Sequence, residues 1–167
     1  MSAAARTLLR GAEETRAFGA RLGRLLAPGD WVALTGELGA GKTTLVAGVV
    51  DGIHPGLRGR SPTYVLVEVY GSGPAIVHAD LYRLRSAAEY ESLGIEDLAA
   101  GEAIVLVEWA DRAADRLPAE RLELELRYAG EDAREVLLRP RGARWEARLA
   151  EGALDSREGR HARGAGH

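Results

Sequence analysis

Eight consecutive residues, Gly36 to Thr43, carry glycine, lysine and threonine at the spacing G-x-x-x-x-G-K-[ST]. In such a loop the glycines let the backbone turn its N–H groups towards phosphate oxygens, while the lysine and threonine serve the phosphates and Mg²⁺. Lys42 is the only lysine in the chain, and arginine supplies every other permanently cationic side chain. Lysine at this one position fits a task that a narrow, flexible ammonium does better than a planar guanidinium. The loop therefore predicts binding of a nucleoside triphosphate.

Two acids stand directly after apolar runs that read as strands. Asp80 follows residues 75–79, and Glu108 follows the longer apolar run, residues 103–107. Carboxylates beside a phosphate loop hold the magnesium shell and orient the attacking water. We expect Glu108 to share the metal with Thr43 and Asp80 to orient the water or touch the ion through water, although the two roles could be exchanged. The alternative for Asp80 is a helix N-cap without a catalytic part.

Residues next to these acids in the sequence could border the same site. Tyr82 and Arg83 follow the first acid, and an arginine there could stabilise transferred charge or only form a surface ion pair. Trp109 follows the second acid, and packing is its favoured interpretation. His78 is favoured as a structural residue rather than a catalyst. The Ser-Pro-Thr of residues 61–63 could reach the γ-phosphate side, as in nucleotide switches, or only form a turn at a strand start.

The hydrophobic pattern supplies the strand, loop and helix that a phosphate loop requires. A short apolar strand at residues 31–35 runs into the loop, and a helix is predicted to start at Lys42. Helical periodicity also covers residues 13–26 and ends before Pro28. The remaining predicted elements are strands at residues 65–69, 75–79 and 103–107, helices at residues 86–100 (interrupted at Gly94) and 109–117, and an antiparallel hairpin around residues 122–138.

The composition describes one globular domain with an ordinary core. The net charge of -3 gives no global basic field that would draw the chain to nucleic acid or acidic lipid. Cysteine is absent, which excludes disulfides and cysteine zinc sites and fits a reducing cytosol. No apolar run approaches the roughly 20 residues that span a bilayer. We expect a cytoplasmic protein with no membrane partner, one domain at residues 1–150, and a flexible tail at residues 151–167.

Four segments follow one another in a specific order: residues 36–44, the Ser-Pro-Thr-Tyr of residues 61–64, the His-Ala-Asp-Leu-Tyr-Arg-Leu of residues 78–84, and the Val-Glu-Trp of residues 107–109. Together they resemble the bacterial TsaE family, the small ATPase required for threonylcarbamoyladenosine synthesis on tRNA. The resemblance implies a P-loop NTPase-like, three-layer α/β domain with a mixed sheet. It also implies weak hydrolysis of ATP with Mg²⁺, stimulated by the TsaD and TsaB subunits of the complex that modifies the adenosine next to the anticodon. Contact with tRNA would be indirect.

The same resemblance assigns roles to individual residues. Thr43 and Glu108 match the family's magnesium positions, and Asp80 matches its essential acid. Thr15 matches a segment near the adenine, and Arg134 a C-terminal arginine near the nucleotide. The residues expected to act in catalysis are Lys42, Asp80 and Glu108. The residues expected to bind the nucleotide are Thr15, Gly36, Glu37, Leu38, Gly39, Ala40, Gly41, Lys42, Thr43, Thr44 and Arg134.

Other functions also use a phosphate loop. A small-molecule kinase would need an acceptor pocket and usually a lid carrying arginines, and no such segment is evident in this short chain. A GTPase-type switch would need the guanine-specifying N-K-x-D, which is impossible because the only lysine lies in the loop. A pure nucleotide-binding module would not need the paired acids Asp80 and Glu108.

Overall fold

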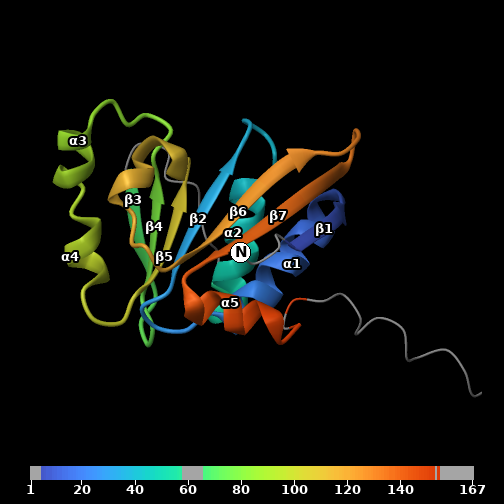
Figure 1. Cartoon of the computed structure of the whole chain (residues 1–167), viewed down its shortest axis with the longest axis horizontal. Coiled ribbons are helices and arrows are strands. Elements are labelled where there is room, and N and C mark those ends of the chain that lie inside the picture. Colours follow the sequence, from blue (N-terminus) through green and yellow to red (C-terminus); the bar gives the residue numbers. More distant parts are fainter. Residues whose placement is uncertain (1–4, 58–65, 153, 155–167) are drawn as a thin grey trace, which may run out of the picture.

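The computed structural model of the chain describes residues 5–57, 66–152 and 154, which form a mixed sheet with helices packed on it (Figure 1). The strands are β1 (Ala5–Arg10), β2 (Trp31–Gly36), β3 (Val67–Tyr70), β4 (Ile76–Asp80), β5 (Ile104–Glu108), β6 (Arg121–Tyr128) and β7 (Ala133–Arg141). The helices are α1 (Gly11–Leu25), α2 (Lys42–Ile53), α3 (Ala87–Ser92), α4 (Ile95–Ala99), the 3-10 helix η1 (Ala110–Arg116) and α5 (Ala143–Ala150).

The strand that carries the glycine loop lies in the middle of the sheet. The strand order is β1-β7-β6-β2-β5-β4-β3, with β2 parallel to both of its neighbours and β4 parallel to β5. The remaining strands pair in an antiparallel way. Because the carboxyl ends of parallel strands meet at one edge, the carboxyl ends of β2, β4 and β5 lie together. Open α/β sheets bind their ligands outside this edge.

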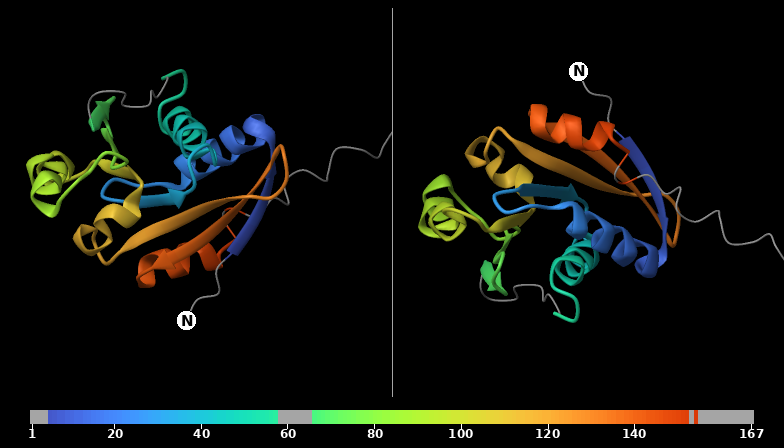
Figure 2. Two further views of the ribbon diagram at one scale, coloured as in Figure 1. Left: turned by 90° about the horizontal axis from the view of Figure 1, so that it is seen from above. Right: turned by 90° about the horizontal axis from the view of Figure 1, so that it is seen from below.

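The two faces of the sheet have separate apolar cores, which gives the three-layer α/β arrangement that the resemblance implies. On one face, alternate residues of the strands pack against α1 and α2, and Figure 2 shows these two helices together on one side of the sheet. Phe18 and Leu22 of α1 and Leu45 and Val49 of α2 are fully buried there. On the other face, β2, β4 and β5 pack against residues of α3, α4 and η1.

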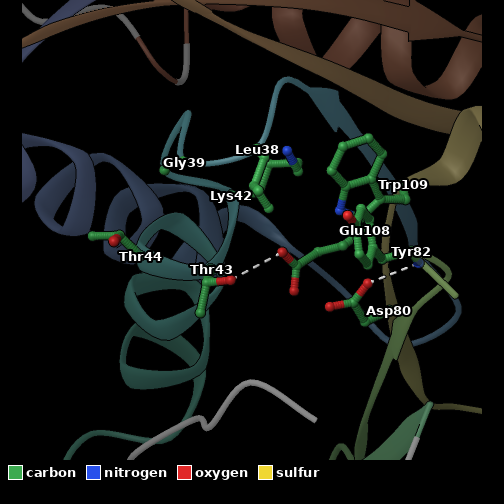
Figure 3. Close-up of a pocket in the computed structure, with 10 residues that line it drawn as sticks. Leu38, Gly39, Lys42, Thr43, Thr44, Asp80, Tyr82, Glu108 and Trp109 are labelled. Atoms are coloured by element: carbon green, nitrogen blue, oxygen red, sulfur yellow. Dashed lines mark hydrogen bonds between the residues drawn. The ribbon is translucent and has the colours of Figure 1, made fainter. Parts of the chain in front are cut away.

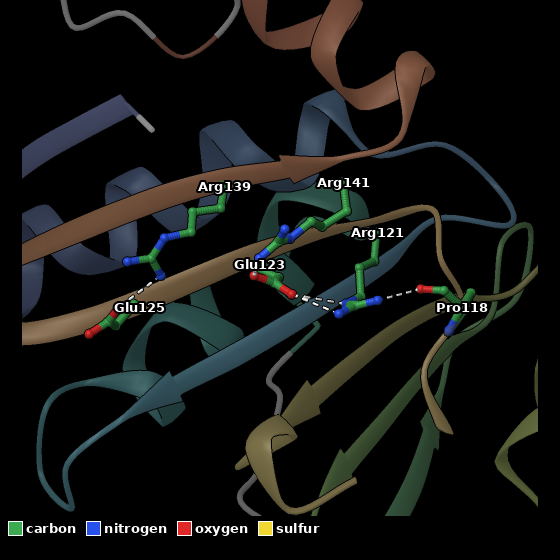
Figure 4. A network of polar contacts seen from close by, with 6 residues as sticks. All are labelled: Pro118, Arg121, Glu123, Glu125, Arg139 and Arg141. Atoms are coloured by element: carbon green, nitrogen blue, oxygen red, sulfur yellow. Dashed lines mark hydrogen bonds and ion pairs between the residues drawn. The ribbon is translucent and has the colours of Figure 1, made fainter. Parts of the chain in front are cut away.

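The face of β6 and β7 that is turned away from α1 and α2 carries a network of paired charges (Figure 4). Leu122, Leu124 and Leu126 of β6 are buried in the core with α1 and α2, so the residues between them point the other way. Glu123 there pairs with two arginines at 2.8 and 3.2 Å, and Glu125 pairs with two more, both at 2.7 Å. Ion pairs of this exposure stabilise the fold little, but they give each carboxylate on this face a partner.

The interface between α1 and α2 is built from glycines, two on each helix: Gly19, Gly23, Gly48 and Gly52. A Cβ at Gly48 would lie 2.2 Å from the backbone oxygen of Arg16, and one at Gly19 would lie 2.3 Å from that of Leu45. Since real Cβ atoms do not approach backbone oxygens so closely, the two helices can touch backbone to backbone only because glycine stands at these positions. The helix that follows the glycine loop is thereby held tightly against α1.

The elements predicted from the sequence are present in the predicted order, with local differences. The predicted helix over residues 86–100 is divided into α3 and α4 at Gly94, which has a φ of 65°. The predicted helix over residues 109–117 is a 3-10 helix with a kink at Ala113. The β3–β4 and β6–β7 pairings are the antiparallel hairpins expected. The sequence pattern predicts neither β1 nor α5.

Helix α5 is held by a charge contact that links distant parts of the sequence. Asp30, fully buried just before β2, accepts hydrogen bonds from Arg148 at 2.6 Å and Arg144 at 3.3 Å, and from the N–H of Ala27 at 2.7 Å. The Arg148 guanidinium also lies 4.3 Å from the ring centre of the buried Trp145. These contacts place α5 at the end of the sheet opposite the glycine loop (Figure 1).

Two predictions fall partly or wholly outside the described residues. The segment of residues 61–63 lies outside them. Of the predicted flexible tail, residues 151, 152 and 154 are described. The side chain of Leu154 is 9% exposed and packs in the apolar core. The tail therefore stays a prediction for the residues beyond. In the ranges that the structure describes, no helix is both long and apolar enough to cross a membrane.

Replacing Gly48 with alanine separates helix propensity from helix packing. In an isolated helix, alanine is favoured over glycine by about 1 kcal/mol. In this fold the new methyl group would meet a backbone oxygen, so we expect Gly48→Ala to lower the free energy of unfolding by about 1–3 kcal/mol. Urea unfolding measures the change, with Ala47→Gly on the same helix as the propensity control. Equal or greater stability of Gly48→Ala would contradict the close packing.

Candidate functional site

The glycine loop connects β2 to α2 by a tight turn that depends on glycine at both ends. Gly41, directly before α2, has a φ of 103°, and a Cβ at Gly36 would lie 2.5 Å from the backbone oxygen of Leu126. The first N–H groups of α2 have no acceptor within the helix, and they carry the positive end of its dipole. The loop and the start of α2 therefore form a site suited to an anion.

The ammonium of Lys42 lies inside the curve of its own loop. Its Nζ donates to the backbone oxygens of Gly36 at 2.6 Å and Glu37 at 2.8 Å, and it lies 4.3 Å from the ring centre of Trp109. The residue is 5% exposed, and this burial lowers the pKa of Lys42, against the opposing pull of Glu108 and of two aspartates. The loop carbonyls thus hold a desolvated cation at the position where a phosphate would meet it.

The two acids meet because β4 and β5 are in register. Asp80 pairs directly with Glu108 across the parallel strands, and Glu108 pairs with Leu34 near the end of β2. Glu108 is 2% exposed, and one of its oxygens accepts a hydrogen bond from the Thr43 hydroxyl at 3.2 Å (Figure 3). This contact joins the helix side of the site to the strand side, and it favours Glu108 as the acid nearer to Thr43.

Asp80 is the more open of the two acids. Its carboxylate accepts a hydrogen bond from the backbone N–H of Tyr82 at 3.0 Å. Burial raises the pKa of Asp80, and the neighbouring Glu108 raises it further, whereas the Tyr82 hydrogen bond and the charge of Lys42 act in the opposite direction. A carboxylate with a raised pKa is a better proton acceptor than an ordinary aspartate.

These groups surround one pocket of about 300 Å³ (Figure 3). Its lining residues are Leu38, Gly39, Gly41, Lys42, Thr43, Thr44, Asp80, Tyr82, Glu108 and Trp109. The structure therefore brings six of the predicted loop residues and both predicted acids to one cavity. Of the other predicted loop residues, Gly36 and Glu37 contribute the carbonyls that hold Lys42, and Ala40 is fully buried in the core.

Thr15, predicted near the adenine, and Arg134, predicted near the nucleotide, lie beside the loop and outside the pocket lining. Thr15 is 2% exposed, and its hydroxyl donates to the Gly11 oxygen within its own helix at 3.1 Å. A Cβ at Gly41 would lie 3.7 Å from the methyl group of Thr15, so Thr15 lies directly next to the loop. Arg134 donates to the Gly39 oxygen at 3.5 Å, at the outer limit of a hydrogen bond.

Tyr128 contacts the glycine loop, which the sequence analysis did not predict. Its hydroxyl donates to the Leu38 oxygen at 2.8 Å, and the Arg134 guanidinium lies 4.3 Å from its ring centre. The alternation of Leu122, Leu124 and Leu126 continues to Tyr128, so the pattern could have placed this tyrosine on the loop side of the sheet.

Trp109 and Tyr82 form the aromatic wall of the pocket, with ring centres 5.0 Å apart. Trp109 has a φ of 56°, a left-handed conformation that costs a bulky residue about 1–3 kcal/mol. This conformation turns its ring over Lys42. Packing was the favoured interpretation of Trp109, and the structure places it at the site. Arg83 is exposed and is absent from the pocket lining.

The oxygen donors of the pocket fit Mg²⁺ shared with a phosphate. Among the described residues, no group of three or more histidines, cysteines or acids could hold a metal ion alone. Mg²⁺ rarely needs such a group, since it keeps several waters and takes one or two protein ligands together with substrate phosphates. Thr43 Oγ1 and Glu108 Oε1 are hard donors, and Asp80 lines the same cavity.

Comparison with known proteins finds relatives that match most of the chain. The family model described as "Threonylcarbamoyl adenosine biosynthesis protein TsaE" matches residues 9–136. A curated Bacillus subtilis protein, "tRNA threonylcarbamoyladenosine biosynthesis protein TsaE", is 37% identical over 135 residues, which cover 80% of this chain and 84% of the relative. The Streptomyces coelicolor protein of the same name is 40% identical over 140 residues, which cover 78% of this chain and 93% of that relative.

A solved structure extends the likeness to the fold. The crystal structure of Bacillus subtilis YdiB is 32% identical in sequence and superposes with a TM-score of 0.73, covering 90% of this chain and 95% of that one. The matched family region contains the glycine loop, both acids and Arg134. The chain therefore belongs to the TsaE family of proteins of tRNA threonylcarbamoyladenosine biosynthesis.

Proposed function

We propose that this chain binds ATP with Mg²⁺ in the pocket between the glycine loop and β4–β5 and hydrolyses it in support of the TsaD–TsaB machinery that modifies tRNA. The observation that carries the proposal is the meeting of Lys42 and Thr43 with Asp80 and Glu108 around one cavity. Family membership supports the place in tRNA modification, and the chain contacts tRNA only indirectly in this proposal.

The loop would bind the triphosphate through backbone N–H groups and the single ammonium. Lys42 would exchange the two loop carbonyls, now at 2.6 and 2.8 Å, for phosphate oxygens. Because the ammonium is already desolvated, a charge-assisted hydrogen bond to phosphate gains more there than in water. Arg134, which contacts the loop at Gly39, would lie on the nucleoside side, while Thr15 would act there only through its buried position next to Gly41.

The two acids, Glu108 and Asp80, would have different roles in the reaction. Thr43 and Glu108 would hold Mg²⁺, which when bound neutralises charge on the phosphate oxygens. Asp80 would orient a water towards the γ-phosphorus and accept its proton as the bond to the β-phosphate oxygen breaks, with the electron pair leaving on ADP. The raised pKa of Asp80 suits a proton acceptor at neutral pH.

Phosphate release from ATP tests the activity and its dependence on partners. We expect slow Mg²⁺-dependent release by the chain alone and faster release when purified TsaD and TsaB are added. Pull-downs of TsaD and TsaB with ATP and then with ADP would show whether association follows the nucleotide state. A small-molecule kinase would instead transfer the phosphoryl group to an added acceptor, and a pure binding module would release no phosphate.

The single lysine offers a direct test of nucleotide binding. Replacing Lys42 with alanine leaves the backbone cradle and removes its only ammonium, so we expect the affinity for ATP to fall by about 10- to 100-fold, as for a lost hydrogen bond to a charged group. Isothermal titration measures the affinity, with Arg116→Ala, which pairs with Glu91 away from the pocket, as the control. Unchanged affinity in Lys42→Ala would contradict the proposed binding mode.

Asp80→Asn separates binding from chemistry. Asparagine keeps an acceptor for the Tyr82 N–H but is a poor proton acceptor, so we expect ATP affinity within about twofold of the native value and hydrolysis slower by about 10²–10⁴-fold. Native hydrolysis by this variant would assign Asp80 a role other than proton acceptor.

The same variant has a second readout in its stability. The pKa of Asp80 is higher in the folded protein than in the unfolded chain. Its protonated form therefore adds stability below the unfolded-chain pKa, and this contribution is lost as the pH rises through the folded-state pKa. Asp80→Asn should therefore unfold at a higher temperature than the native protein at neutral pH. The difference should shrink towards about pH 4, near the ordinary carboxyl pKa. A difference that grows on acidification would contradict the burial argument.

A further inference from the structure

The carboxylate of Glu108 has a second partner on the side away from the pocket. His78 lies on β4 and is fully buried, and its Nε2 is 2.6 Å from Glu108 Oε2. The other oxygen, Oε1, accepts the Thr43 hydroxyl at 3.2 Å. The two oxygens of one carboxylate are thus divided between a buried imidazole and the residue expected to share the metal.

The surroundings of the imidazole define which atom carries the hydrogen. His78 Nδ1 is buried and has no hydrogen-bond partner among the described residues. An ionised carboxylate oxygen can only accept a hydrogen bond, so the 2.6 Å contact with Glu108 Oε2 assigns a hydrogen to Nε2, which donates it. The ring also lies over Tyr70, with centres 6.4 Å apart and planes at 29°, which limits its rotation.

We propose that His78 is a positioning residue, which holds Glu108 in the orientation that turns Oε1 towards Thr43, where the metal would bind. The inference rests on the proposed function, since it concerns the carboxylate assigned there to Mg²⁺. A buried carboxylate without a donor would turn to find another partner, because burial of an unpaired charge is costly. Partners that orient a metal ligand typically change metal affinity by 10- to 100-fold when removed.

The chain offers matched variants that differ in their ability to donate at the same point. The amide nitrogen of glutamine lies near the Nε2 position of histidine, so His78→Gln keeps a donor to Glu108. His78→Leu keeps the apolar volume and removes the donor. The measurement is the affinity of Mn²⁺, a probe for Mg²⁺, for the ATP-loaded protein, followed by electron paramagnetic resonance of free Mn²⁺. ATP affinity in EDTA is measured in parallel.

We expect His78→Leu to bind Mn²⁺ about 10- to 100-fold more weakly than the native protein, with ATP affinity in EDTA unchanged. We expect His78→Gln to recover most of the Mn²⁺ affinity. Native Mn²⁺ affinity in His78→Leu would overturn the proposal, and so would equal losses in both variants. If His78→Leu does not fold by circular dichroism, His78→Asn replaces it, because the shorter amide does not reach Glu108.

A failure of the proposed function has a different signature. Glu108→Gln shows how far the Mn²⁺ affinity falls when the carboxylate assigned to the metal is removed. If this variant binds Mn²⁺ as the native protein does, the assignment of Glu108 to the metal is wrong. If Glu108→Gln loses affinity and His78→Leu does not, the metal site stands and only the role of His78 is rejected.

Discussion

The parallel pairing of β4 with β5 and of β5 with β2 is the constraint on which the site depends. Each strand contributes one end to the same edge of the sheet: the glycine loop from β2, Glu108 from β5 and Asp80 from β4. A slip of one residue in the β4–β5 register would turn one acid to the opposite face of the sheet. The separate apolar cores on the two faces fix this register, because they require alternate residues of each strand to point in defined directions.

Burial disfavours the charged forms of two groups at the site, which costs stability. The same exclusion of water lowers the pKa of Lys42 and raises that of Asp80, so both groups are held in a medium that disfavours their charged forms. The fold tolerates this because each charge has partners: two loop carbonyls for Lys42, a backbone N–H for Asp80, and Thr43 and His78 for Glu108. The glycine interface of α1 and α2 keeps the start of α2 in place while these charges face one another.

Local spacing made much of the fold and site predictable, and contacts between distant residues account for the rest. The glycine loop and the acids after apolar runs are readable because each signal occupies a few consecutive residues. Helix α5 was missed because its anchor, Asp30, is more than 100 positions from Arg144 in the sequence. The interpretation of His78 as structural rather than catalytic agrees with its burial, but its contact with Glu108 depends on a strand pairing that spacing does not reveal. For Trp109, packing was favoured over a place at the border of the site, because no local pattern predicts its left-handed backbone.

The charges around the pocket explain why a metal ion belongs to the proposed function. Among the described residues that line the cavity, Lys42 is the only cation, and Asp80 and Glu108 contribute two carboxylates. A triphosphate entering alone would add several negative charges to a cavity that already carries a net negative charge, and in a poorly solvated site such repulsion is strong. A divalent cation entering with the phosphates supplies the missing positive charge next to Thr43 and Glu108. In the proposed function, the pair of acids that would repel free nucleotide would thus favour its complex with Mg²⁺.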